Sequence, residues 1–157
     1  MIVVPAALLL IALLLYFAFS NLSQVVLILV NVPLAVIGGV IALYVSGQYL
    51  SVPSSVGFIT LFGVAVLNGV VMVESINQRI NAGDRKDKAV FDGAVSRLRP
   101  VLMTALTSML GLIPMLLSTG IGAEIQKPLA TVIVGGLVSA TFLTLFVLPV
   151  LYKSMSK

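Results

Sequence analysis

The sequence predicts an all-α protein that crosses a membrane several times, built as one transmembrane domain over residues 1–157. Of the 157 residues, 60% are hydrophobic and only 9% are charged, and the mean hydropathy is +1.21. Soluble domains carry about 25% charged residues, so the composition excludes an ordinary soluble fold. The apolar residues also form long blocks without the period-two alternation of barrel strands, which favours transmembrane helices.

Several functional classes are excluded by the residue types that the chain lacks. It has no cysteine and no histidine, so it can build neither a disulfide framework nor a Ser-His or Cys-His catalytic pair. We therefore expect no enzymatic activity and no cofactor. Nine basic and five acidic residues give a net charge of +4, but no basic face exists apart from one loop, so no nucleic-acid partner is expected.

Five apolar blocks are each close to the roughly 20 residues that a helix needs to cross about 30 Å of hydrocarbon. The first block lacks a basic segment before it and a small-residue cleavage site, so it is interpreted as a retained helix rather than a signal peptide. The five expected helices cover residues 2–19, 25–45, 55–76, 101–117 and 129–152.

The orientation follows from the loop between the third and fourth blocks. Because basic loops stay on the cytoplasmic side, this loop is expected on the cytoplasmic side of the membrane. The amino terminus is then outside, and the tail with Lys153 and Lys157 is cytoplasmic. Six of the nine basic residues lie in the loop: Arg79, Arg85, Lys86, Lys88, Arg97 and Arg99.

An uncharged amino terminus outside the membrane, followed by an odd number of spans, is unusual for an independent protein. We therefore expect the chain to be a piece of something longer. Whether it is a natural truncation, half of a split gene or a stand-alone membrane scaffold stays open at this point, as does the origin of Met1.

Within the basic loop, residues 85–98 are expected to form a short amphipathic helix on the cytoplasmic membrane surface. Its basic residues are expected to meet lipid headgroups, with docking of another cytoplasmic segment as the alternative. Apolar residues recur there on one helical face, at Val90, Phe91, Ala94, Val95 and Leu98.

Small residues spaced four apart occur on three of the expected spans. In lipid, helix association depends on close backbone approach, which such spacing allows. These residues are therefore expected to pack helices together rather than to take part directly in transport. They are Ala35 and Gly39, Ala65 and Gly69, and Gly136 and Ala140.

Polar groups within the spans are candidates for function because hydrocarbon makes them unfavourable. Arg97 and Thr104 lie seven residues apart and so nearly share a helical face, as a protonation-linked network requires. The alternative is that Thr104 bonds its own backbone at i−4 and Arg97 extends to lipid phosphates. Glu74, the only acid within an expected span, is either an anchor at the interface or a proton carrier.

Three motifs in order resemble the resistance-nodulation-division (RND) efflux pumps, in the heavy-metal branch of the CzcA type. The resemblance covers residues 2–152 and corresponds to the last five of the family's twelve helices. The motifs are GFITLFGVAVLNGVVMVESINQ, RLRPVLMTALTSMLGLIPMLLSTGIGAEIQKPLA and GGLVSATFLTLFVLPVLY.

The resemblance implies an inner-membrane homotrimer that uses proton influx to export its cargo through a periplasmic adaptor and an outer-membrane channel. It implies that the amino-terminal half and a porter domain belong to the same pump, so this chain would be inactive alone. In related multidrug pumps an Arg and a Thr of the proton relay match Arg97 and Thr104, while the relay Lys falls at Leu67, beside Asn68. Glu74 is expected to modulate proton release on the cytoplasmic side.

The cargo is the least determined property. The resemblance implies that copper and silver relatives carry a methionine relay, with a Met at the position of Gln126 in this chain. An amide oxygen is a poor ligand for Cu(I). Divalent Zn, Co, Cd or Ni is therefore expected, with no metal ligand assigned in this chain. Export of hydrophobic drugs or lipids by the same architecture is the alternative.

Overall fold

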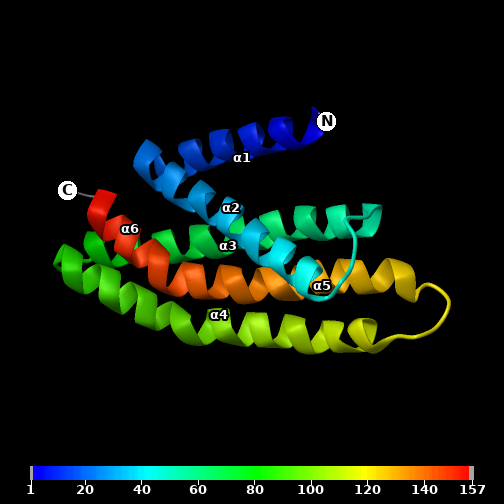
Figure 1. The fold of residues 1–157 in the computed structure, drawn as a ribbon. Coiled ribbons are helices and arrows are strands. Elements are labelled where there is room, and N and C mark those ends of the chain that lie inside the picture. The colour runs from blue at the N-terminus through cyan, green and yellow to red at the C-terminus, as the bar shows by residue number, and fades with distance from the viewer. Residues whose placement is uncertain (1, 156–157) are drawn as a thin grey trace.

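The computed structural model describes residues 2–155, so Lys157 of the expected cytoplasmic tail lies outside the described residues. Within them every regular element is helical (Figure 1). A five-residue π-helical turn, η1, joins the last two α-helices into one continuous rod. The elements are α1 (Val3–Phe19), α2 (Leu22–Val45), α3 (Val52–Asn81), α4 (Lys86–Leu117), α5 (Ala123–Phe142), η1 (Leu143–Val147) and α6 (Leu148–Met155).

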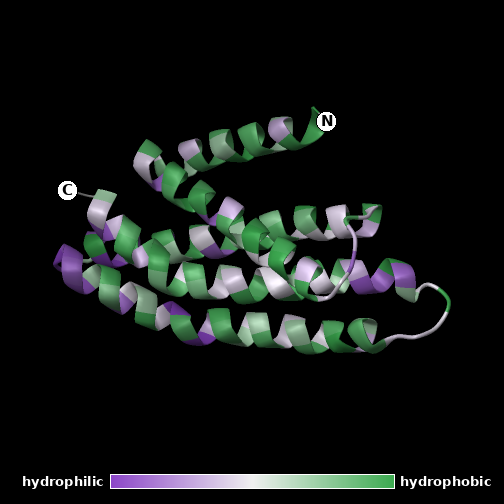
Figure 2. Ribbon diagram, viewed as in Figure 1, coloured by the Kyte–Doolittle hydropathy of each residue, from purple (hydrophilic) through white to green (hydrophobic). Residues whose placement is uncertain are grey.

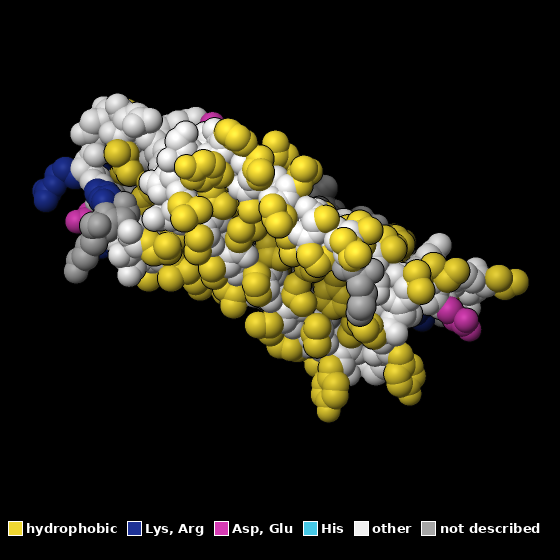
Figure 3. Space-filling view, turned by 90° about the horizontal axis from the view of Figure 1, so that it is seen from above, with side chains coloured by type: hydrophobic (Ala, Val, Ile, Leu, Met, Phe, Trp, Pro, Cys, Tyr) yellow, Lys and Arg dark blue, Asp and Glu magenta, His cyan; other side chains and the backbone are white. Residues whose placement is uncertain are grey.

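The helix lengths agree with a polytopic membrane protein. Four helical segments are long and apolar enough to cross a membrane: α2, α3, α4, and α5 with its continuation through η1 and α6. The remaining expected span is the first in the chain, α1, which has 17 residues and so is at the lower limit for crossing a bilayer. Hydrophobic residues dominate the middle of the helices, and hydrophilic ones gather at the start of α4 and of α5 (Figure 2). Lys and Arg side chains gather at one end of the molecule in Figure 3.

The expected amphipathic segment is helical but is not a separate element. It forms the first part of α4, which continues without a break across Pro100 into the expected fourth span. The amino-terminal part of α4 is held against α3, because Val90 and Gly93 are buried and a Cβ on Gly93 would lie 2.9 Å from Cγ1 of Ile76. The segment therefore packs on a neighbouring helix as well as presenting an apolar face.

Two other helices begin earlier in the chain than the apolar blocks predict. The third helix starts at Val52 rather than 55 because Ser51 and Ser54 form a capping box, and it continues to Asn81 beyond the apolar block. The last helix starts at Ala123 rather than 129, with Glu124 in its first turn, where an acid is favourable next to the helix dipole. In both cases polar residues extend a helix beyond the apolar block.

Two helices, α2 and α5, cross with almost no side chains between them. A Cβ on Gly135 would overlap that of Ala42, and one on Gly38 would overlap that of Ser139. Ser139 also donates a hydrogen bond to the Leu34 carbonyl across this crossing, at 3.2 Å. Close approach of this kind replaces the hydrophobic driving force that helices lack in lipid.

The small residues singled out by their spacing are all buried. Gly136 faces Leu61 so closely that a Cβ would overlap its side chain, and Gly69 packs on Ile28 and on the Asn31 amide of α2. Gly39 packs on Phe58. The other three residues of the set are alanines, and all belong to the buried cluster between α2, α3 and α5: Ala35, Ala65 and Ala140.

Candidate functional site

The four relay candidates lie on two adjacent helices, α3 and α4. Glu74 and Thr104 are exposed, whereas Asn68 and Arg97 are half-buried. Within residues 2–155 no hydrogen bond or ion pair joins any two of these four side chains. The chain therefore supplies candidate groups on adjacent helices, without connecting them itself.

Thr104 has a local partner, its own helix. Its hydroxyl donates to the Pro100 carbonyl at 2.8 Å, which is the i−4 bond that the sequence offers as the alternative to a relay role. Pro100 lies within α4, at the level where the polar part of that helix becomes apolar. The hydroxyl thus supports the backbone in this structure.

Replacing Thr104 by valine is therefore expected to change the stability of the fold very little. The shape is kept and only an exposed, local hydrogen bond is lost, so we expect a change of less than about 0.5 kcal/mol in the free energy of unfolding. Thermal unfolding in detergent would measure it. A much larger loss would show that the hydroxyl contacts another part of the protein.

Arg97 lies in a polar cavity at the basic end of the bundle, with a volume of about 420 Å³. Arg79, across this cavity, forms long ion pairs with Asp84 at 3.9 Å and with Asp92 at 3.8 Å. Ser75 and Ser96 join α3 to α4 by a hydroxyl–hydroxyl bond of 3.2 Å in the same cavity. The cavity combines charge, hydrogen-bonding groups and access to water, which a proton pathway needs.

Glu74 lies on the outer side of α3 and accepts a hydrogen bond of 3.3 Å from the Gln78 side chain one turn later. Its exposed carboxylate has no cationic partner among the described residues. The neighbouring position Leu67 is also exposed, at 61%. A face of α3 that carries an acid, an apolar residue and no covering helix is available to another part of a larger protein.

Sequence reasoning did not find the polar cluster that joins α2, α3 and α6. Gln24 and Asn77 form two reciprocal amide hydrogen bonds of 2.9 and 3.0 Å, and the Tyr152 hydroxyl donates to the same Asn77 oxygen at 2.6 Å. Each of these residues lies near a helix end, where polar residues are common. No signal in the sequence pairs them.

A second buried polar contact lies deeper in the bundle. Asn31 of α2 donates to the Thr144 hydroxyl at 3.3 Å, and the Thr144 side chain is fully buried within η1. π-helical turns are rare and often occur at functional sites. Both residues are polar groups within apolar blocks of the sequence, and the contact between them is a finding of the structure.

No metal centre is present in the part of the chain that the structure describes: no group of three or more histidine, cysteine or acidic side chains lies close enough to hold an ion. A cavity of about 610 Å³ lies at the opposite end of the bundle from the basic loop. Gln48, Glu124 and Lys127 are among the residues that line it. One acid opposite a lysine does not form a site for a divalent cation.

Known proteins resemble the chain along almost its whole length. The cobalt-zinc-cadmium resistance protein CzcA of Cupriavidus metallidurans is 52% identical over 152 residues, which are 97% of this chain and 14% of that protein. The nickel and cobalt resistance protein CnrA of the same organism is 53% identical over 150 residues, 96% of this chain and 14% of that protein. The cation efflux system protein CusA of Escherichia coli is 40% identical over 163 residues, 97% of this chain and 16% of that protein.

The fold is also found in solved structures. A crystal structure of a heavy metal efflux pump matches with a TM-score of 0.90 and 50% sequence identity, over 99% of this chain and 16% of that one. The chain thus spans about a seventh of the length of the curated relatives it matches. The model of the AcrB/AcrD/AcrF family matches residues 1–156, and the chain belongs to this family.

Proposed function

We propose that the chain is the carboxy-terminal membrane part of a proton-driven transporter that exports divalent heavy-metal cations. The observation that carries this proposal is the identity of 52–53% with proteins named for cobalt, zinc, cadmium and nickel resistance, over nearly the whole chain. CusA, a cation efflux protein, is less similar, at 40%. The metals named for the more similar relatives, together with the amide at Gln126, favour a divalent cargo over Cu(I).

The exposed side of α3 and α4 supports the proposal that the chain works within a larger transporter. A Cβ on Gly63 or on Gly111 would meet no neighbouring atom, and α4 is the least buried of the long helices. Small residues on an uncovered transmembrane face leave room for another helix to approach. We assign this face to the amino-terminal half of the same transporter, which would complete the relay beside Arg97, Thr104 and Asn68.

The proposal extends to the assembly. The transporter is proposed to be a homotrimer in the bacterial inner membrane, acting with a porter domain, a periplasmic adaptor and an outer-membrane channel. The basic end of the bundle, seen in Figure 3, is assigned to the cytoplasm, and the start of α1 to the periplasm.

Transport by the full-length protein in inverted membrane vesicles tests the proposal. Zn²⁺, Co²⁺, Cd²⁺ or Ni²⁺ is expected to accumulate in the vesicles when a proton gradient is applied and to stop accumulating when a protonophore collapses it. Transport of dyes or detergents without transport of metals would favour the drug or lipid alternative. No transport of any cargo by the full-length protein would favour a scaffold.

Glu74 provides a second test of the same proposal. Glu74→Gln removes the charge and keeps the shape, so we expect metal transport to fall a few-fold and its dependence on cytoplasmic pH to weaken. Glu124→Gln is the matched control, because Glu124 is exposed at the opposite end of the bundle and should leave both unchanged. Unchanged transport and pH dependence in Glu74→Gln would contradict a role for this carboxylate in proton release.

A further inference from the structure

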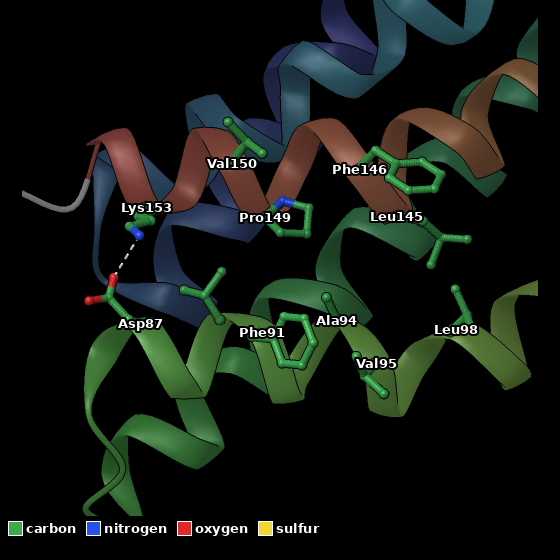
Figure 4. A pocket seen from close by; sticks show the side chains of 11 residues that line it. Asp87, Phe91, Ala94, Val95, Leu98, Leu145, Phe146, Pro149, Val150 and Lys153 are labelled. Atoms are coloured by element: carbon green, nitrogen blue, oxygen red, sulfur yellow. Dashed lines mark ion pairs between the residues drawn. The ribbon is translucent and has the colours of Figure 1, made fainter.

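A groove runs between α4 and the carboxy-terminal rod and is open to the surroundings along its length. Its first part, of about 400 Å³, is lined by Phe91 and Ala94 from α4 and by Phe146 and Val150 from η1 and α6. Figure 4 shows these side chains on the two helices that border the groove. We call this the α4–α6 groove.

The groove continues into the bundle rather than ending at the basic loop. A second cavity, of about 350 Å³, shares Leu98, Leu145 and Phe146 with the first and extends to Met109 and Val138. Its walls are apolar side chains and a single threonine, Thr141, which is buried. An apolar channel open to the side is suited to a flexible hydrocarbon chain.

Charge is confined to one end of the groove. Lys153 of α6 and Asp87 in the first turn of α4 form an ion pair of 3.0 Å there, and their side chains are 64% and 69% exposed (Figure 4). Asp87 belongs to the basic loop, and Lys153 follows the last expected span, which ends at residue 152. The hydrogen bond and the positive charge of Lys153 lower the pKa of the Asp87 carboxyl, so this carboxyl is ionised at neutral pH.

The length of the groove matches one leaflet of a bilayer. From Lys153 to Val138 the rod advances by 15 residues, which is about 23 Å at helical rise. Half of a bilayer, headgroups included, is about 20–22 Å thick. The charged end therefore lies at headgroup depth when the apolar end lies near the bilayer centre.

We propose that the α4–α6 groove binds one phospholipid of the cytoplasmic leaflet whose headgroup carries a phosphate and a primary ammonium. Lys153 pairs with the phosphate, Asp87 accepts hydrogen bonds from the ammonium, and an acyl chain lies along Phe91, Leu98 and Phe146. An exposed ion pair contributes little to the stability of the fold. Lys153 and Asp87 can therefore separate, and each can pair instead with the opposite charge of a zwitterionic headgroup. The apolar face of residues 85–98 then contacts lipid, held against α6 rather than lying alone on the membrane surface.

The test uses the full-length protein in nanodiscs that contain equal amounts of phosphatidylethanolamine, phosphatidylglycerol and phosphatidylcholine. After mild delipidation, the lipids retained per chain are counted by native mass spectrometry. We expect phosphatidylethanolamine to be retained about fivefold over each of the other two, equivalent to about 1 kcal/mol. Phosphatidylglycerol lacks the ammonium, and the methylated ammonium of phosphatidylcholine cannot donate the hydrogen bonds that Asp87 accepts.

Asp87→Asn is expected to abolish this preference, because the amide has no charge to pair with the ammonium. Asp92→Asn is the matched control: it makes the same charge change on the same helix, but Asp92 pairs with Arg79 away from the groove. Ala94→Trp, which fills the groove, is expected to lower retention of every phospholipid. Folding of each variant is checked by its thermal unfolding.

Three results would overturn the proposal. They are equal retention of the three lipids, a preference that survives Asp87→Asn, and efficient crosslinking of Val95→Cys to another protein segment. Residues 1–157 contain no native cysteine, so a crosslink that requires Val95→Cys would show that a helix or a second copy occupies the groove. None of these readouts depends on transport, so their failure leaves the proposed function untouched.

Discussion

Replacing Gly135 by valine is expected to force α2 and α5 apart and to lower the free energy of unfolding by about 3 kcal/mol. A Cβ at this position would overlap the Cβ of Ala42 and would lie 3.1 Å from the Gly38 carbonyl oxygen. Backbone cannot rotate away as a long side chain can, so the helices themselves must move. The loss would spread, because the same crossing carries the Ser139 hydrogen bond to the Leu34 carbonyl.

The measurement is the thermal unfolding of the purified protein in detergent. Gly120→Val is the matched control, because Gly120 lies in the loop after α4, has a negative φ and has no neighbour within reach of an added Cβ. We expect the control to unfold at the native temperature. Equal unfolding temperatures for the two variants would mean that the helices are not in close contact at Gly135.

The composition and the block lengths were sufficient to predict an all-helical membrane protein, because burial in lipid imposes one length and one kind of backbone on every span. They were not sufficient to predict how α4 begins. Residues 85–98 show helical periodicity, and Pro100 marks a possible helix end, since a proline either ends a helix or is accommodated within it. Contact of Gly93 with Ile76 decides in favour of one long helix, and that contact depends on the tertiary structure.

Small-residue spacing shows which helices pack closely, but not where they cross. The pattern selects Gly39 and Gly136, whereas the tightest overlaps between α2 and α5 are at Gly38 and Gly135, one residue earlier on each helix. A shift of one residue turns the contact by about 100° around a helix, and only the partner helix determines which side is used. Spacing alone could not find this crossing.

The candidate site shows the same limit. Arg97 and Thr104 share a helix, so their relative position follows from the sequence, and Thr104 makes the bond to Pro100 that its local geometry allows. Gln24, Asn77 and Tyr152 come from three helices and are separated by 53 and 75 residues along the chain. Their proximity depends on how α2, α3 and α6 pack, which no local pattern encodes.

Replacing Asn77 by leucine is expected to be the most damaging change to the polar interactions of the bundle, lowering the free energy of unfolding by about 2 kcal/mol. The substitution removes both hydrogen bonds to Gln24 and the acceptor of the Tyr152 hydroxyl, leaving Gln24 with only its long bond of 3.4 Å to the Tyr152 hydroxyl. Tyr152→Phe removes the bond to Asn77 and this long bond but keeps the ring in place, so its expected loss is about 1 kcal/mol. Unfolding in mixed micelles with increasing SDS would measure both.

A double variant separates the energy of the bonds from the penalty of unpaired groups. When Gln24 and Asn77 are both replaced by leucine, no amide is left unpaired, so we expect the double variant to be more stable than the sum of the single losses predicts. Single interhelical hydrogen bonds in membrane proteins average only about 0.6 kcal/mol, so a coupling well above this value would show that the two amides act as one unit. Strict additivity would instead mean that water satisfies each amide separately, and that the reciprocal bonds add nothing to the packing of α2 against α3.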